Sequence, residues 1–454
     1  MLTADLPVAT RSCASPPVLT FANLFQQPYF FQPSPLVVNP RLAAEIAYVV
    51  RREDHPFYRY EALITEPAHD YGSGRQESGS NHGFGASFND PAEALAKSVF
   101  EAWERKFSKV YDPAQLIAGS YEALAERAVD PNAFTRISDW EYQQSPLDYI
   151  RYSPDLNLSW KECYRVCNRV LEPVLIPATL VYSRYSWKHP RERFVPNLSP
   201  GLACHATLRE AFFGGLCELL ERDAFMLAWL HRRSPPRIRP ETIAFDEAAE
   251  AIDYFNALGF LFHFLDLTTD VGIPVILTLI EHPDLPWNGT IVPGLGCALD
   301  PHVALRKSLL EALIMLANHV TVDHLRSKLT LQERPLPYSL QPDDYYRKVR
   351  FLLENEQQTA IQDLASHDRK DPGRNVEFLV GHLADLGHTT YFVDLTPPGY
   401  EDSRICLTRA MVTGLQPMLY EPDCWRLNAQ RLFGDGPPAF ERLNVMPHPF
   451  MLME

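Results

Sequence analysis

The chain has 454 residues and a formal charge of −15, and its 46% hydrophobic and 22% charged residues are typical of a folded globular protein. The acidic balance argues against a protein that coats nucleic acid or an anionic membrane surface. The start of the chain lacks a basic segment followed by an apolar core, and no uncharged apolar run approaches about 18 residues. We therefore expect neither a signal peptide nor a membrane span.

The cysteines are scattered along the chain without any CxxC pair. This pattern predicts reduced thiols and a cytoplasmic location rather than a disulfide framework. Cys163 and Cys167 are four residues apart, a spacing that favours one face of a helix over a zinc site.

In chain order, residues 1–66 are expected to form an N-terminal arm and lead-in that could contact a partner, and residues 67–454 one large domain. A helix is predicted to start at Asp90-Pro91, because Asp is a good N-cap and Pro suits the first turn. A Pro-rich loop and an exposed helical insertion are expected near residues 329–372, and the chain ends in a Pro-rich tail. Short apolar runs predict strands at Val174 to Tyr182, Gly272 to Ile280, Thr389 to Leu395 and Cys406 to Val412. In the first two, the regular strand is expected to start after the internal proline.

A unit made of a Gly-containing turn and an amphipathic helix occurs three times. The segment 200–204 reads PGLAC and the segment 293–297 reads PGLGC, and a glutamate follows each proline at a distance of 18 residues. The same distance separates Gly83 from a third glutamate. The three glutamates are Glu101, Glu218 and Glu311. The repeat predicts three helices that each present one glutamate inward.

An ExxER motif occurs on the first and second of these helices, at residues 101–105 and 218–222. The second helix is apolar almost all round, which predicts burial, and buried carboxylates need a cation. Oxygen ligands favour Mg²⁺ over zinc, and Mg²⁺ held by carboxylates usually also binds phosphate, so the pattern predicts a site for a magnesium nucleotide. A solvent-exposed ExxER face is the alternative. The cations available to phosphates are Lys97, Arg105, Arg222, Arg306 and Lys307.

The sequence has no P-loop, no dinucleotide-binding GxGxxG, no kinase motifs, and neither HExxH nor GxSxG. A nucleotide site in this chain is therefore expected to be built on helices rather than on a Gly-rich loop. Helices that alternate with short strands predict an α+β fold of mixed and antiparallel sheets with internal pseudo-repeats. In this fold, the glutamates would line a central cleft.

Taken together, these elements resemble the YcaO superfamily over residues 70–454. The resemblance rests on the first ExxER helix, the segment 201–224 with its ExxERDA ending, the helix that follows Gly294, and the proline-rich end, which occur in the family's order. The segment 412–417 and the Pro447-His-Pro-Phe450 end are most similar to the azoline-forming cyclodehydratase component. This component acts in the biosynthesis of thiazole- and oxazole-modified ribosomal peptides, including bacteriocins.

The resemblance implies that ATP phosphorylates a peptide-backbone amide oxygen after a Cys, Ser or Thr side chain has added to the carbonyl. Phosphate then leaves, and the product is a thiazoline or oxazoline. The implied cofactors are ATP and Mg²⁺. The residues implied to bind them are Glu101, Glu104, Arg105, Glu210, Glu218, Glu221 and Arg222, with Glu101, Glu104, Glu218 and Glu221 as metal ligands. Further cofactor-binding candidates are Lys97, Ser98, Arg306 and Glu311.

The chain departs from the family pattern at several positions. Lys97 stands where a serine is often found, His205 replaces the second glycine of the turn, and Ile314 replaces a glutamine. The family's PxPxP end reads Pro447-His-Pro-Phe-Met451, and three more residues follow it. These departures concern the ligands and the tail more than the fold.

The attacking thiol or hydroxyl needs a base. His448 and the terminal carboxylate of Glu454 are the catalytic candidates if the tail docks at the site. The alternative for the Pro-His-Pro segment is a rigid surface tail.

Residues 1–66 are too few for a full leader-binding module. The expected partners are therefore a leader-peptide-binding protein that resembles ubiquitin-activating enzymes and the precursor peptide itself, while a flavin dehydrogenase in the same complex and a homodimer stay open. Two other functions also remain open at this stage. One is ATP-dependent thioamidation of the peptide backbone, and the other is a scaffold that binds no nucleotide.

Overall fold

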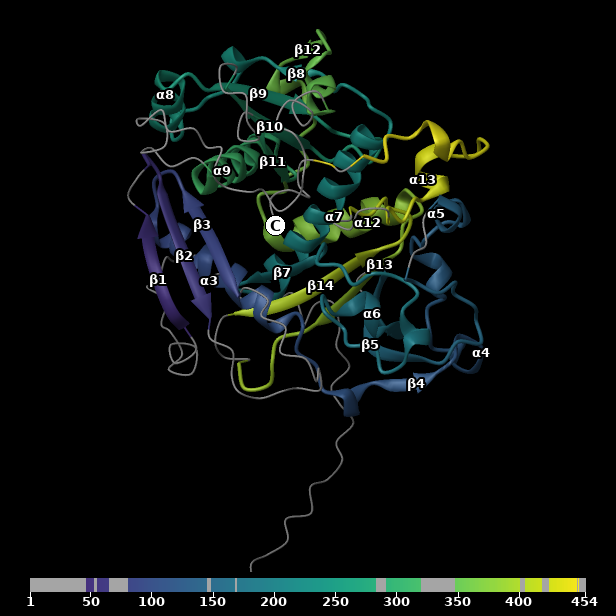
Figure 1. The fold of residues 1–454 in the computed structure, drawn as a ribbon. Coiled ribbons are helices and arrows are strands. Elements are labelled where there is room, and N and C mark those ends of the chain that lie inside the picture. The colour runs from purple at the N-terminus through teal and green to yellow at the C-terminus, as the bar shows by residue number, and fades with distance from the viewer. Residues whose placement is uncertain are drawn as a thin grey trace, which may run out of the picture.

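The computed structural model describes residues 46–52, 55–64, 81–144, 148–167, 170–282, 291–319, 348–400, 405–418, 424–446 and 448. Within these residues the strands form three sheets (Figure 1). The first sheet has the order β1 (Ile46–Arg52), β2 (Tyr58–Ile64) and β3 (His82–Ser87). The second has the order β11 (Ile291–Cys297), β10 (Val275–Glu281), β9 (Leu261–Asp266), β8 (Arg237–Ile238) and β12 (Gln358–Thr359). The third has the order β4 (Ile117–Gly119), β5 (Leu158–Cys167), β13 (Thr390–Asp394), β14 (Cys406–Val412) and β7 (Leu202–His205), with β6 (Val170–Pro177) paired to β5. The described strand pairs are antiparallel, except that β8 runs parallel to β12.

Long helices cover these sheets, and α7 runs through the middle of the molecule (Figure 1). The described α-helices are α3 (Pro91–Phe107), α4 (Tyr121–Leu124), α5 (Asp139–Gln144), α6 (Ala178–Val181), α7 (Leu208–Leu230), α8 (Ala249–Ala257), α9 (Pro301–His319), α12 (Pro372–Asp385) and α13 (Ala429–Phe433). Helix α3 packs on β2 and β3, α9 on β10 and β11, and α7 on β7 and β14. The largest core cluster surrounds α7, with side chains from β10, β11, α12 and β14, so α7 is buried as its composition predicts.

Several predicted elements are confirmed with their caps. Asp90 is the N-cap of α3, its carboxylate accepts from the backbone N–H of Ala92 and Glu93, and Pro91 is the first helical residue. Strands β13 and β14 lie where the apolar runs predict them, and β10 begins directly after Pro274. The mixed and antiparallel α+β fold is therefore the one expected from the sequence.

Three local predictions are wrong. Strand β6 ends at Pro177 instead of starting after it, and α6 follows, because proline has no N–H to extend the ladder. Cys163 and Cys167 lie on strand β5 rather than on a helix, the first buried and the second exposed. The described part of the expected helical insertion is not an exposed helix: it holds a short 3₁₀ turn whose Phe351 and Leu352 are in the main core. Residues 320–347 lie outside the described residues.

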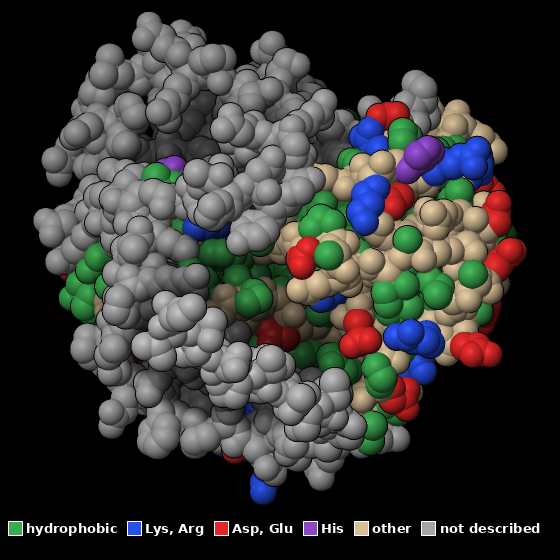
Figure 2. Space-filling model, turned by 90° about the horizontal axis from the view of Figure 1, so that it is seen from below, with side chains coloured by type: hydrophobic (Ala, Val, Ile, Leu, Met, Phe, Trp, Pro, Cys, Tyr) green, Lys and Arg blue, Asp and Glu red, His purple; other side chains and the backbone are tan. Residues whose placement is uncertain are grey.

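Strand β1 pairs with β2, and β2 pairs with β3, so the lead-in residues from 46 onward share one sheet with the strand that precedes α3. In the described part of the chain, no helix is both long and apolar enough to cross a membrane. Figure 2 shows acidic and basic side chains interspersed over the described part of one face.

Candidate active site

Each of the three repeated glutamates accepts a hydrogen bond from a backbone N–H of the turn or strand before its helix. Glu101 Oε2 lies 2.6 Å from the nitrogen of Phe84, and Glu218 Oε2 lies 2.9 Å from that of Gly201. Glu311 Oε2 lies 2.6 Å from the nitrogen of Leu295. The three copies of the unit therefore share one local geometry, in which the backbone N–H orients the carboxylate.

The first and third units match in detail. The ammonium of Lys97 donates to the carbonyl of Ala86, and that of Lys307 to the carbonyl of Cys297, both at 3.2 Å. The buried hydroxyl of Ser98 donates to Leu95, as that of Ser308 donates to Leu305. The glutamate follows its N–H donor by 17 residues in the first and second units and by 16 in the third. The residue that begins the 18-residue spacing therefore stands one position earlier, relative to the donor, in the third unit.

Glycines let strand and helix approach closely in these two units. A Cβ on Gly83 would lie 2.1 Å from the carbonyl oxygen of Ser98, and one on Gly294 would lie 2.2 Å from that of Ser308. In the second unit Gly214-Gly215 stands where the first has Lys97-Ser98, and Gly215 packs against the carbonyl of Gly201. The second unit therefore lacks the lysine of the other two.

The structure brings the two ExxER motifs together. Burial, and then the negative charges of Glu218 and Glu101, raise the pKa of Glu104 well above its ordinary value, while Arg105 and Arg409 oppose this shift. Glu104 on α3 and Glu218 on α7 are therefore close enough to repel each other.

The third helix contributes to the same cluster of carboxylates. Burial raises the pKa of Glu221 to about 8, with Glu311 and Glu218 adding repulsion and Arg222 and Lys307 opposing it. The pKa of Glu311 is also raised by burial, and by Glu218 and Glu101. Arg222 Nη2 lies 3.6 Å from Glu218 Oε1 and 3.7 Å from Glu221 Oε1. The glutamate cluster thus comprises Glu101, Glu104, Glu218, Glu221 and Glu311.

The cations predicted to bind phosphates are not equally available. Arg105 pairs with Glu101 at 2.7 Å and stays partly exposed. Arg306 pairs with Glu93 at 2.9 Å and with Glu247 at 2.7 Å, so its charge is already matched by two carboxylates. The ammonium of Lys97 also lies 2.7 Å from Glu93. Burial lowers the pKa of Lys97, and the neighbouring Arg306 and Lys307 lower it further, against the attraction of Glu93.

Glu210 lies in the first turn of α7, eight residues before Glu218, which corresponds to about 12 Å of helix rise between these two glutamates. Thr207 is the N-cap, and its hydroxyl donates to Glu210 Oε2 at 2.9 Å. His205 Nδ1 lies 2.9 Å from the same oxygen. Burial acts to raise the pKa of Glu210, but the contacts with His205 and Thr207 lower it overall.

Arg409 is a residue of the site that sequence reasoning missed. Its side chain is 5% exposed, and its Nη1 donates to the carbonyls of Leu198 and Ser199 at 2.7 and 2.9 Å. Burial lowers its pKa to about 10, against the attraction of Glu218 and Glu104. The only sequence signal was a charged residue inside the apolar run of β14.

The tail packs along α7. The indole of Trp229 donates to the carbonyl of Met446 at 3.0 Å, and the buried ring of His448 lies 5.7 Å from that of Phe225 and 6.4 Å from that of Trp425. His448 is fully buried, so the alternative of a surface tail is wrong at this position. Glu454 lies outside the described residues.

The donor set of the glutamate cluster fits Mg²⁺ with a phosphate ligand. Burial, together with repulsion by neighbouring carboxylates, raises the pKa of Glu104, Glu221 and Glu311, and a divalent cation would stabilise their ionised forms. Among the described residues, no three His, Cys, Asp or Glu side chains are already spaced to hold a metal ion alone. Mg²⁺ usually keeps waters and substrate phosphates as ligands, so one or two of these carboxylates for each ion are enough.

Comparison with known proteins identifies the family. The family model for the YcaO cyclodehydratase domain, which binds ATP and Mg²⁺, matches residues 83–416. The chain therefore belongs to the YcaO family, a family of ATP-dependent enzymes, and its cofactors are ATP and Mg²⁺.

An uncharacterized protein encoded in the tfuA 3′ region of Rhizobium leguminosarum bv. trifolii is 30% identical over 237 residues, which cover 49% of this chain and 52% of that protein. The chain thus spans about half the length of this relative. A heterocyclase solved in complex with substrate and cofactor has a similar fold, with a TM-score of 0.71 and 21% identity over 89% of this chain and 55% of that one. YcaO from Methanopyrus kandleri, bound with AMPPCP and Mg²⁺, has a TM-score of 0.58 and 20% identity, over 82% of this chain and 87% of that one.

Proposed function

We propose that the protein is the ATP- and Mg²⁺-dependent cyclodehydratase component that forms thiazoline or oxazoline rings from Cys, Ser or Thr in a ribosomally made precursor peptide. The observation that carries this proposal is the convergence of five glutamates from three helices in a YcaO-family chain. The site clusters buried acids beside cations, which suits phosphoryl transfer.

In this proposal, Glu101, Glu104, Glu218 and Glu221 hold Mg²⁺, and Glu311 is the fifth carboxylate of the glutamate cluster. The backbone N–H groups of the three turns fix the carboxylates before the nucleotide arrives. The lysines at 97 and 307 and the arginines at 105 and 222 would bind the phosphate oxygens of the nucleotide. When bound, ATP supplies the phosphoryl group that turns the amide oxygen into a leaving group.

The peptide side chain adds its sulfur or oxygen to the preceding carbonyl carbon, and its proton passes to a base. This addition closes the five-membered ring. The former amide oxygen would take the phosphoryl group, with ADP as the other product, and would leave as inorganic phosphate. Loss of the proton on the amide nitrogen would then give the carbon–nitrogen double bond of the azoline. The base is assigned to the tail, as His448 or the terminal carboxylate. His448 lies two turns along α7 from Glu218, where it also holds the tail in place.

A separate protein is expected to bind the leader of the peptide. The heterocyclase of similar fold is a longer chain, of which this chain matches 55%, and it was solved with its substrate. We propose that a partner protein takes the place of the part of that longer chain which this chain does not match.

Calorimetry with ATP tests the first step. The wild-type chain should bind ATP only with Mg²⁺, and Glu218→Gln should abolish the binding while the exposed control Glu241→Gln leaves it unchanged. Mg²⁺-dependent binding that survives Glu218→Gln would contradict the assignment. With partner and peptide present, loss of one water identifies an azoline, whereas exchange of oxygen for sulfur identifies thioamidation.

A further inference from the structure

A cavity lies along helix α12, and none of the five glutamates of the cluster lines it. It has a volume of about 830 Å³, within the range of ligand pockets. One wall is a stripe of α12 from Arg374 to Ala384, roughly 15 Å of helix. The other wall is formed by the end of β5 and the start of β13. We call this the α12 groove, and none of the site residues described above lines it.

Positive charge is concentrated at the α12 groove, although the whole chain carries a charge of −15. Arg165, Arg369 and Arg374 line it, against a single acidic lining residue, Glu377. Arg165 is partly matched by Glu172 at 3.3 Å. The guanidinium of Arg369 lies 4.5 Å from the ring centre of Phe378, and both Arg369 and Arg374 are exposed. Two guanidinium groups are thus presented to an incoming anion.

A glycine in the middle of α12 keeps the α12 groove open. Gly381 lies in the interior of the helix, where glycine is less favourable than alanine. A Cβ at this position would meet no atom within 4 Å, so the packing of the chain does not require glycine here. Glycine at such a position suits a backbone that another molecule approaches closely.

We propose that the α12 groove binds an acidic stretch of the precursor peptide, outside the residues that become rings. This inference rests on the proposed function, which supplies a peptide as substrate. Carboxylates of the peptide pair with Arg369 and Arg374, whose guanidinium groups suit bidentate contacts. Its apolar side chains pack beside the half-buried Phe378, and its backbone crosses Gly381.

The test uses a fluorescein-labelled decapeptide of alternating Glu and Val, which contains no Cys, Ser or Thr. Fluorescence anisotropy should show binding to the full chain, and the matching Lys-Val peptide should not bind. Arg369→Glu/Arg374→Glu should weaken the affinity by about tenfold or more, because two charge-assisted contacts are reversed. Gly381→Trp should block the groove to a similar extent.

Two controls keep the result specific. Arg191→Glu/Arg442→Glu reverses two exposed arginines elsewhere and should change the affinity by less than about twofold, through screened long-range charge alone. Mg²⁺–ATP binding by each variant shows that it is folded.

The exposed Cys167 lines the groove, so the Glu-Val peptide should slow the modification of this thiol by a maleimide, as followed by mass spectrometry.

The failure of this inference can be separated from that of the proposed function. Equal affinity of the wild type and both groove variants overturns the inference even if rings form, and so does displacement of the peptide by an equal concentration of inorganic phosphate. Conversely, the peptide could bind in a groove-dependent way while no rings form. This result would support the acidic-peptide site and contradict only the proposed ring-forming function.

Discussion

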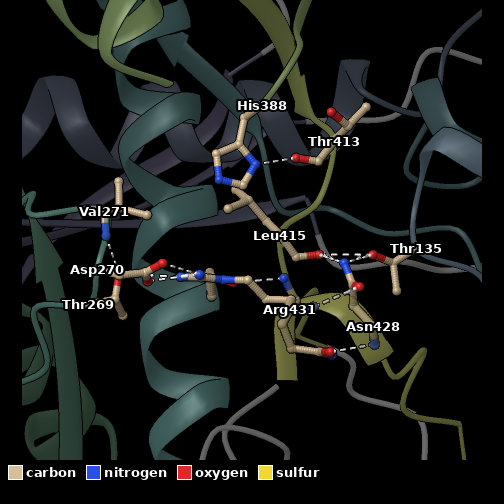
Figure 3. A network of polar contacts seen from close by, with 11 residues as sticks. Thr135, Thr269, Asp270, Val271, His388, Thr413, Leu415, Asn428 and Arg431 are labelled. Carbon is tan, nitrogen blue, oxygen red and sulfur yellow. Dashed lines mark hydrogen bonds and ion pairs between the residues drawn. The ribbon is translucent and has the colours of Figure 1, made fainter. Parts of the chain in front are cut away.

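The guanidinium of Arg431 binds the carboxylate of Asp223 through Nε at 3.0 Å and Nη2 at 2.7 Å, and both side chains are buried. Asp223 follows the second ExxER motif directly, and it also accepts from the backbone N–H of Gln416 at 2.8 Å. Figure 3 shows Arg431 reaching Asp270, which its Nη1 contacts at 2.8 Å. This pair ties the C-terminal segment to the helix that carries Glu218.

Asp223→Ala should lower the free energy of unfolding by about 3–5 kcal/mol, because it leaves the guanidinium of Arg431 buried without its main partner. The other acid on the same guanidinium provides the matched control. Asp270 is 73% exposed, so Asp270→Ala should cost less than about 1 kcal/mol. Urea unfolding of both variants measures the difference. Equal losses would show that the buried pair is not what anchors the C-terminal segment.

The repeated units could be predicted from the sequence because each is local. The helix periodicity, the N-cap and the glycine turn lie within about 20 residues of the glutamate that they position, as Gly83 and Glu101 show. The convergence of Glu101, Glu218 and Glu311 followed from the repeat and from the apolar surroundings of α7.

Partners that are distant in the chain could not be predicted. Arg431 meets Asp223 across 208 residues, and Arg306 meets Glu93 across 213. Nothing near either arginine in the sequence indicates its carboxylate partner, so the sequence predicts Arg306 as a phosphate ligand. Arg409 enters the site only because β14 pairs with β7, a contact between strands about 200 residues apart.

The glycines of the first and third units should be among the least replaceable positions. Gly83→Ala and Gly294→Ala place a methyl group within 2.2 Å of a helix carbonyl, so strand and helix must separate. We expect a loss of about 1–3 kcal/mol in unfolding free energy and weaker Mg²⁺–ATP binding, since the N–H groups that orient Glu101 and Glu311 shift.

Gly381→Ala is the matched control for both glycine variants. Its methyl group meets no atom within 4 Å, and alanine favours the helix, so stability should rise by up to about 1 kcal/mol. Thermal unfolding and calorimetry of the three variants check these expectations. If Gly83→Ala proves as harmless as Gly381→Ala, the close approach of strand and helix is not needed for folding.

Two adjacent cations on α9 should have different roles. Arg306 is matched by Glu93 and Glu247, so Arg306→Ala should mainly reduce stability. Lys307 acts electrostatically on Glu221 and keeps two of its three ammonium protons for other acceptors, so Lys307→Ala should weaken ATP binding by about tenfold or more. Calorimetric affinity and urea unfolding of both variants separate the roles. A larger loss of affinity for Arg306→Ala would reverse the assignment.

The raised pKa of Glu221 makes the stability of the metal-free protein depend on pH. Its pKa is about 8 in the folded chain and 4.5 as the ordinary value, so between these limits the folded chain binds the additional proton. The stability contributed by this proton is present below about pH 4.5 and is lost as the pH rises toward 8, at up to about 1.4 kcal/mol per pH unit. Urea unfolding without Mg²⁺ between these pH values should show the fall, and Glu221→Gln should flatten it.

The same carboxyl links metal binding to proton release. Because Mg²⁺ binds the ionised carboxylate, Mg²⁺–ATP affinity should rise by up to about tenfold per pH unit below pH 8 and level off above it. Calorimetry at pH 7 in two buffers with different ionisation enthalpies measures the proton released on binding. Glu241→Gln, an exposed acid outside the cluster, should leave this release unchanged. If wild-type affinity is independent of pH from 6 to 8, Glu221 is already ionised in the metal-free protein, and the repulsion among the five glutamates is relieved by the chain's own cations.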